Sequence, residues 1–206
     1  VQDQSIDKFY DEQGICHVVL PERGHLAPGL FCVGGDSHSP TGGAFGAYMF
    51  GIGATEMAGV LATGEIWIKV PETILMSWRN QLSAYVTAKD MMLAMCRKIG
   101  MGGGRYQAIQ YAGQTIQALS MQERMTLSNM AAELGAQAGL IAPDEATVAF
   151  VQAAGGTVPA NWRDFQIEAA ESAENVMQFD AASLEPQIAA PHSPENADAA
   201  DAFRNI

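Results

Sequence analysis

The sequence is short of basic side chains. Its 206 residues hold 11 lysines and arginines against 23 aspartates and glutamates, which gives a formal net charge of −12. A nucleic-acid groove or an anionic membrane surface requires clustered positive charge, so we expect neither as a partner. From Asp144 onwards the basic residues are Arg163 and Arg204 alone. An anionic substrate would therefore need a focused site or cations supplied from elsewhere.

Long apolar runs are also missing. No stretch reaches the roughly 18 uninterrupted apolar residues of a membrane span. Residues 1–14, VQDQSIDKFYDEQG, are polar and partly acidic rather than basic and then apolar like a signal sequence. We therefore expect a cytoplasmic protein. Hydrophobic residues make up 48% of the chain, which is enough to build a sizeable core.

Cysteine is scarce as well. Cys16, Cys32 and Cys96 stand at wide spacings, with no C-x-x-C pair and no Cys/His cluster of the zinc type. Cys32 and Cys96 have apolar neighbours, so we expect small buried core residues rather than nucleophiles. The residues of this chain predict no metal site.

Short apolar segments bounded by glycine and proline alternate with helical patterns, which predicts an α/β fold. Strands are expected at residues 15–20, 29–35, 65–70, 72–78 and 106–113. Helices are expected at 43–64, at 88–99 between Thr87 and Gly100, and at 126–139 after an opening Thr126, whereas 169–179 fits either element. We divide the chain into a first domain (1–78), a second α/β unit (79–155) and a loop-rich return segment with an acidic tail (156–206). Both ends are expected to be cut from something longer.

Asp36, Ser37 and His38 stand together between glycines, directly after a predicted strand. Ligands collect at the carboxyl ends of strands in α/β sheets, so this loop can present all three groups to one cavity. Asp and Ser also form local turns with the backbone, and for the triplet alone a structural turn is the favoured interpretation.

Two further positions are candidate partners of the triplet. His17 lies in a neighbouring predicted strand and is either a core histidine or, beside a parallel strand, a partner of Asp36. Asn129 and Glu133 are four residues apart on one helix face, where Glu133 is either a surface residue or a partly buried carboxylate. His25 and His192 lie in proline-bounded loops and are expected to be solvated.

Four segments resemble successive parts of the aconitase and 3-isopropylmalate dehydratase large-subunit family. They are GICHVVLPERGHLAPG (14–29), residues 33–73 around VGGDSHSPTGG, MTLSNMAAELGAQAGLIAPDE (125–145) and DAASLEPQIAAPHSPEN (180–196). The resemblance implies aconitase-like α/β/α layered domains. It also implies an iron-sulfur hydro-lyase that moves water on a small di- or tricarboxylic hydroxy acid, 3-isopropylmalate dehydratase-like and hence of leucine biosynthesis.

The resemblance also implies roles for individual residues. His17 with Asp36, and His38 with Glu133, are implied to be catalytic imidazole–carboxylate pairs that relay protons. Ser37 is implied to contact a substrate carboxylate and Asn129 to pack against a 4Fe-4S cluster. A small subunit carrying a swivelling domain is the implied protein partner.

Several family features are absent from these residues. The family's cluster cysteines, one in a Cys-Thr-Asn segment and two in a C-x-x-C, do not occur in the sequence, nor does its proton-abstracting serine segment. We therefore expect a central piece of a large subunit that binds no cluster alone and is inactive alone. Alternatives are a methylmalate or maleate hydratase-like or homoaconitase-like member, and a cluster-free module for carboxylate binding or subunit interaction. A metal-independent hydrolase would rest on Ser37 and His38 alone.

The coding sequence is expected to continue past Ile206 into a Cys-Thr-Asn segment and a C-x-x-C. Sequencing of the neighbouring DNA checks this, and a gene that ends here or continues without those cysteines contradicts the resemblance.

Overall fold

The computed structural model describes residues 3, 6–165 and 175–204. The α-helices are α1 (Cys16–Glu22), α2 (Ala54–Thr63), α3 (Ala88–Ile99), α4 (Gln114–Ala118), α5 (Met121–Asn129) and α6 (Glu145–Ala153). The strands are β1 (Phe31–Gly34), β2 (Tyr48–Gly51), β3 (Thr73–Arg79), β4 (Ala108–Ala112), β5 (Ala138–Ile141), β6 (Asn175–Asp180), β7 (Gln187–Ala189) and β8 (Ala197–Ala199). Short 3₁₀ helices include η2 (Ser39–Phe45) and η3 (Met130–Ala132).

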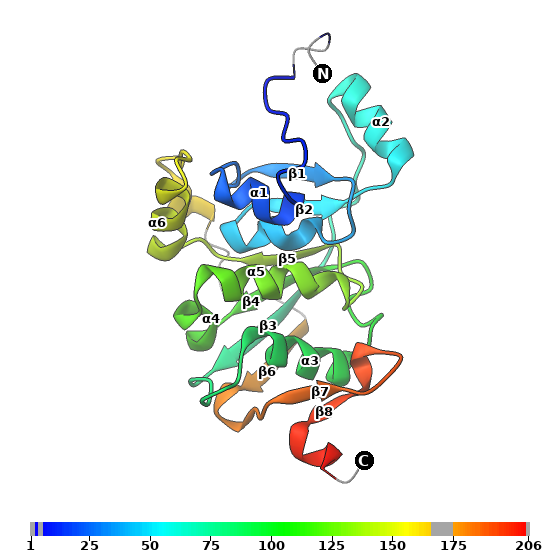
Figure 1. Cartoon of the computed structure of the whole chain (residues 1–206), viewed down its shortest axis with the longest axis vertical. Helices are drawn as coiled ribbons and strands as arrows, with labels where there is room; N and C mark the ends of the chain where they lie inside the picture. Colours follow the sequence, from blue (N-terminus) through cyan, green and yellow to red (C-terminus); the bar gives the residue numbers. More distant parts are fainter. Residues whose placement is uncertain (1–2, 4–5, 166–174, 205–206) are drawn as a thin grey trace.

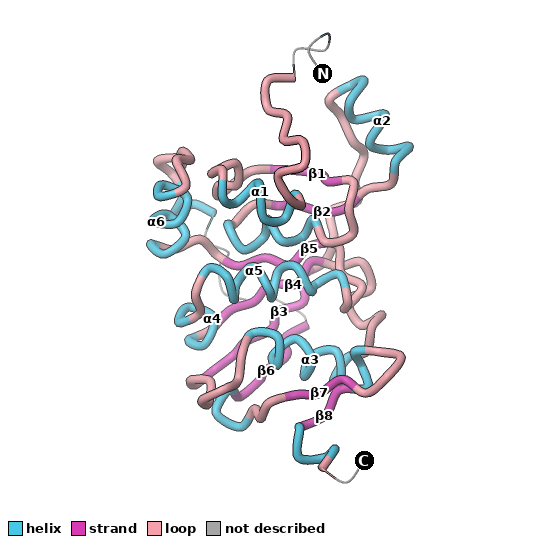
Figure 2. Tube along the Cα trace, in the orientation of Figure 1, coloured by secondary structure: helices cyan, strands magenta, loops and turns pink. Residues whose placement is uncertain are grey.

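The centre of the molecule is a parallel sheet of four strands in the order β5-β4-β3-β6. Leu75 of β3 pairs with Gln110 of β4 on one side and with Val176 of β6 on the other. Helices α3 and α5 lie across one face of this sheet (Figure 1). A parallel pair, β1-β2, lies beyond β5, and an antiparallel pair, β7-β8, lies beside α3 (Figure 2). The predicted α/β class is confirmed.

The main core fills the space between the sheet and these two helices. Trp78 of β3, Tyr111 of β4 and Leu127 of α5 are buried in it together with three methionines of α3: Met91, Met92 and Met95. The predicted helix at 88–99 is confirmed, with Thr87 and Asp90 forming its capping box and Gly100 ending it. The strand predictions at 29–35, 72–78 and 106–113 are confirmed within one to two residues at most ends.

A second apolar cluster joins the β1-β2 unit to the rest. It holds Phe45 and Met49 against Met121 at the start of α5 and Val151 of α6. Directly beside it, η2 lies so close to β5 that a Cβ added to Gly43 would be 1.8 Å from the carbonyl oxygen of Gly139. This contact fixes the β1-β2 unit against the main sheet.

The strand prediction for residues 15–20 is wrong, because this segment forms α1. Its apolar residues do not alternate: Val18 is exposed, Val19 is buried and Leu20 is half-buried. Residues of strand preference form helix where packing favours it, since propensity is weaker than tertiary contact.

The single buried helix predicted at 43–64 is also wrong. The segment divides into η2, β2 and α2, and Gly46, at φ 71°, ends η2. The ten residues of α2 all lie in the described range, and none of them is buried. Within that range, the strand predicted at 65–70 is not formed either, and Trp67 there is 86% exposed.

The helix predicted at 126–139 differs at both ends. Helix α5 begins at Met121, where Ser120 and Glu123 form a capping box, so Thr126 lies inside the helix instead of opening it. It ends at Asn129, and residues 138–139 belong to β5. Of the 169–179 segment, residues 175–179 belong to β6 and the others lie outside the described residues. The main sheet takes strands from all three predicted divisions of the chain, and that division stays a prediction. Within the described ranges, no helix combines the length and the apolar character needed to cross a bilayer.

Replacing Gly43 with alanine is expected to lower the free energy of unfolding by about 1–3 kcal/mol, because the new methyl group meets a backbone carbonyl. Gly59→Ala is the matched control. A Cβ at Gly59 meets nothing within 4 Å, and alanine in a helix gains roughly 0.5–1 kcal/mol over glycine. Urea unfolding midpoints of both variants measure the difference, and equal midpoints contradict the inferred contact.

Candidate functional site

The Asp-Ser-His loop is a tight turn at the carboxyl end of β1. A Cβ added to Gly51 would lie 2.4 Å from the Asp36 carbonyl oxygen, so the loop lies directly on β2. Within the turn, the Ser39 hydroxyl donates to the Asp36 carbonyl at 2.8 Å and the His38 N–H donates to Asp36 Oδ1 at 2.7 Å. The glycines here provide close packing, and the loop is fixed by its own hydrogen bonds.

The first imidazole–carboxylate pair joins α1 to this loop. His17 Nε2 lies 2.9 Å from Asp36 Oδ1, with 13% of the His17 side chain and 50% of the Asp36 side chain exposed. A hydrogen bond from the backbone N–H of His38 lowers the pKa of Asp36. Partial burial raises this pKa, and the neighbouring His17 lowers it further. Asp36 is therefore a carboxylate at neutral pH and accepts a hydrogen bond from His17.

The second pair joins the loop to the end of η3. His38 Nε2 lies 3.1 Å from Glu133 Oε1, and the Ser37 hydroxyl lies 3.0 Å from His38 Nδ1. If His38 donates to Glu133 through Nε2–H, its Nδ1 is the acceptor and the Ser37 hydroxyl is the donor. Glu133 Oε2 is buried and has no hydrogen-bond partner among the described residues. The rings of His17 and His38 are 6.2 Å apart, so the two pairs are neighbours.

Asn129, at the end of α5, donates from Nδ2 to the Thr41 hydroxyl at 2.9 Å. With His17 and Glu133 it lines a cavity of about 460 Å³, whereas Asp36 and Ser37 line a different cavity of about 420 Å³. The six predicted residues therefore lie in one region, but five of them line two cavities rather than the single one expected from the sequence, and His38 lines neither.

Sequence reasoning did not include Cys16 in this site. Its Sγ lies 3.3 Å from His17 Nδ1, because the first turn of α1 brings the two neighbouring side chains together. Burial and the charge of Asp36 both raise the pKa of Cys16, so it stays a thiol near neutral pH. In the His17 tautomer that donates to Asp36 from Nε2–H, Nδ1 is the acceptor for the thiol proton. The one sequence feature that could have pointed to Cys16 is its position directly before His17.

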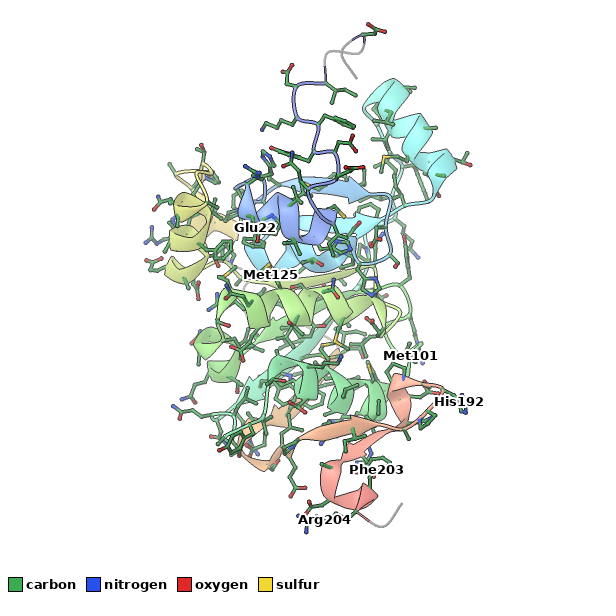
Figure 3. The ribbon with its side chains drawn as sticks, viewed as in Figure 1. Glu22, Met101, Met125, His192, Phe203 and Arg204 are labelled. Atoms are coloured by element: carbon green, nitrogen blue, oxygen red, sulfur yellow. The ribbon has the colours of Figure 1, made fainter. Side chains whose placement is uncertain are left out.

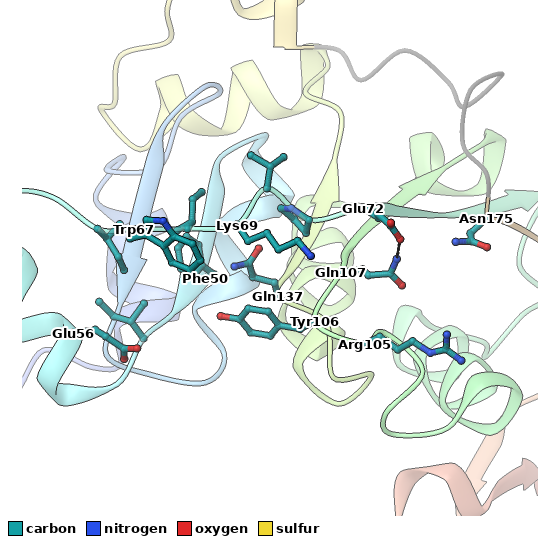
Figure 4. Close-up of a pocket in the computed structure, with 15 residues that line it drawn as sticks. Phe50, Glu56, Trp67, Lys69, Glu72, Arg105, Tyr106, Gln107, Gln137 and Asn175 are labelled. Atoms are coloured by element: carbon teal, nitrogen blue, oxygen red, sulfur yellow. Dashed lines mark hydrogen bonds between the residues drawn. The ribbon is translucent and has the colours of Figure 1, made fainter.

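A larger cavity of about 680 Å³ adjoins the one lined by Asp36, since both include Ile52, Tyr106 and Gln137. Figure 4 shows Lys69 and Arg105 on its walls, and Glu72 joined to Gln107 by a 2.8 Å hydrogen bond. A carboxylate ligand in the adjoining cavity, the one lined by Asp36, would need positively charged partners such as Lys69 and Arg105.

The remaining histidines are outside the site. His192 is exposed, as predicted, and lies beside Met101 near the C-terminal segment, far from α1 (Figure 3). His25 was also expected to be solvated, but it is half-buried and its Nε2 contacts the Tyr10 hydroxyl.

The described residues do not form a ligand set for an iron-sulfur cluster. They contain no group of three His, Cys, Asp or Glu side chains that could hold a metal ion. Cys16 is exposed, Cys32 is half-buried and Cys96 is buried in the main core, so no two of them share an environment. The cysteines here do not suit a cluster, which requires thiolates gathered at one point.

Comparison with known proteins gives consistent matches along the chain. The family model described as the aconitase family (aconitate hydratase) matches residues 1–204. A probable 3-isopropylmalate dehydratase large subunit of Methanothermobacter thermautotrophicus is 44% identical over 197 residues, which are 95% of this chain and 46% of that protein. A probable methanogen homoaconitase large subunit of Methanosarcina mazei is also 44% identical over 197 residues, 95% of this chain and 50% of its own length. The chain spans about half the length of the curated relatives it matches.

Changing Asp36 to asparagine is expected to lower the pKa of Cys16, because one of the two causes that raise it disappears. Alkylation of Cys16 at pH 8 should then become faster, by up to about tenfold for a change of one pH unit.

Cys32 is the internal reference for this measurement. Burial alone raises its pKa, so its alkylation rate should not change. Rates are read by mass spectrometry of the labelled peptides, and an unchanged Cys16 rate contradicts the proximity of thiol and carboxylate.

Proposed function

Because the chain belongs to the aconitase family, we propose that it is part of a hydro-lyase that adds and removes water on a small hydroxy acid. The observation that carries the proposal is the meeting of two imidazole–carboxylate pairs, His17–Asp36 and His38–Glu133, on either side of Ser37. The names of the matching relatives favour a role of the 3-isopropylmalate dehydratase large-subunit type.

Elimination of water requires a proton for the departing hydroxide, and the reverse reaction requires a base for the incoming water. A histidine held by a carboxylate suits both steps near neutral pH. We assign the proton at the hydroxyl to the protonated form of His38, whose Nε2–H is held by Glu133 and whose Nδ1–H is the proton that is given up. Asp36 accepts from water or substrate through its exposed half, and His17 holds it in place.

Ser37 is proposed to bind a substrate carboxylate. Its oxygen lies 3.0 Å from His38 Nδ1 and accepts from Nδ1–H when His38 is protonated, so the Ser37 hydroxyl is then free to donate to a carboxylate next to the proton donor. A second anionic group of the substrate could extend towards Lys69 and Arg105 through the adjoining cavity.

The family implies a 4Fe-4S cluster, which would supply Lewis-acid chemistry in the complete protein. The described residues do not suit it, so we propose that its cysteine ligands belong to parts of the protein beyond these 206 residues. Asn129 would then lie at the boundary with the cluster, since it lines the cavity next to Glu133. A small subunit is the proposed partner.

Homoaconitase activity is the second candidate, because one 44% identical relative carries that name. The two activities differ in the acid that is bound. A module that binds a carboxylate without turnover is the alternative from another class.

His38→Gln in the complete large subunit, assayed with its small subunit and 3-isopropylmalate, is expected to lower kcat by about 10²–10⁴-fold through loss of the proton donor. Glu133→Gln should lower kcat in the same direction, and the double variant should lose no more than the worse single one, because the pair acts as a unit.

His192→Gln is the matched control, since it makes the same change at an exposed and distant histidine. Activity of His38→Gln within about twofold of His192→Gln would refute the proposed role. Carboxylate binding without any turnover in the unmodified complex would instead favour the binding module.

A further inference from the structure

A fourth cavity, with a distinct electrostatic character, lies away from the Asp-Ser-His loop. It has a volume of about 600 Å³ and lies between the turn after α1 and the turn after α6. Lys8, Arg23 and His25 line it, together with Thr157 and backbone of the glycine turn at 155–156. No aspartate or glutamate occurs among its described lining residues. Three basic side chains around one space are notable in a chain with a net charge of −12.

The walls of this cavity are closely packed. A Cβ added to Gly24, at φ +65°, would lie 2.4 Å from the backbone nitrogen of Gly156, and a Cβ on Gly156 would meet the Gly24 carbonyl oxygen at 2.4 Å. A Cβ on Gly29 would collide with the Phe165 ring at 2.3 Å. The two turns therefore touch through their backbones, and the space between them has a defined shape.

The basic side chains form a chain of contacts. Lys8 Nζ lies 3.5 Å from His25 Nδ1, the Tyr10 hydroxyl contacts His25 Nε2, and Arg23 lies over the Tyr10 ring at 5.7 Å. Because an ammonium group only donates, His25 Nδ1 is the acceptor, and Nε2–H then donates to Tyr10. Burial, Lys8 and Arg23 each lower the pKa of His25, so the ring is neutral at pH 7.

Within residues 3, 6–165 and 175–204, the two permanent cations of this group have no carboxylate partner. Among the described residues, the ion pairs of the chain's basic side chains involve Arg79, Arg97, Arg124, Arg163 and Arg204. Arg23 instead donates from Nη2 to the Gln13 side chain at 3.1 Å, and Lys8 contacts His25. Both retain donors, and the described lining residues of the cavity include no acid that compensates their charges.

We propose that this cavity binds a compact anion with two or more negative charges, of the phosphate or dicarboxylate class, between Lys8 and Arg23. Such an anion accepts from both cations and removes the crowding of like charge around His25. It would also fix the turn after α1, the helix that carries His17. The inference does not depend on the proposed hydro-lyase activity.

The test is an NMR titration of the His25 ring in the 206-residue chain, with inorganic phosphate added at constant ionic strength against chloride. The His25 signal is assigned with His25→Gln. Bound phosphate should raise the pKa of His25 towards its ordinary value in a saturable way, and malate or succinate tests the dicarboxylate class. Lys8→Gln and Arg23→Gln should each weaken the apparent affinity by about tenfold, the loss of one charge-assisted contact.

Lys89→Gln is the matched control, because it removes the same charge at an exposed position outside this cavity. An identical His25 response to phosphate and chloride, or equal affinities of Lys8→Gln and Lys89→Gln, would reduce the effect to general screening and overturn the proposal. Should a variant fail to fold, the comparison of phosphate with chloride in the unmodified chain decides alone. A rise in the unfolding temperature with phosphate but not with chloride is the second expected result.

Discussion

The close approach of η2 to β5 is the constraint on which the rest of the structure depends. Gly43 and Gly139 lie in backbone contact, where no side chain fits between them. This contact holds the β1-β2 unit, which carries the Asp-Ser-His loop, against the unit that carries Glu133. His38 and Glu133 are 95 residues apart in the sequence, and only a firm junction between the units keeps them at hydrogen-bond distance.

The elements predicted correctly from the sequence are those that carry a local signal, either a residue pattern or a helix cap, within their own few residues. Strand β3 and helix α3 are examples, because alternation or caps identified each of them. Residues 15–20 and 43–64 failed for a shared physical reason. Both are mostly apolar or small, so their composition does not indicate which side chains meet a neighbour, and long-range packing decides between helix, strand and turn.

The pairing of the site residues was better predicted than the elements around them, and their roles stay a prediction. The four partners His17, Asp36, His38 and Glu133 meet as the resemblance implied, although α1 is a helix and not the expected strand. The structural turn is present, and it does not exclude a reaction site, because Asp36 Oδ1 both accepts from the His38 backbone and faces His17. Cys16 and the division into two cavities could not be inferred, since both depend on how α1 lies against the loop.

Helix α2 has a further consequence for how the chain behaves in solution. Its ten described residues are all at least partly solvent-exposed, and Leu61 and Trp67, in and just after the helix, are 75% and 86% exposed. A helix with so little tertiary contact opens at a small free-energy cost. Its amides should therefore exchange with deuterium long before those of α3, and a protease should cleave residues 54–70 while the main sheet is still intact.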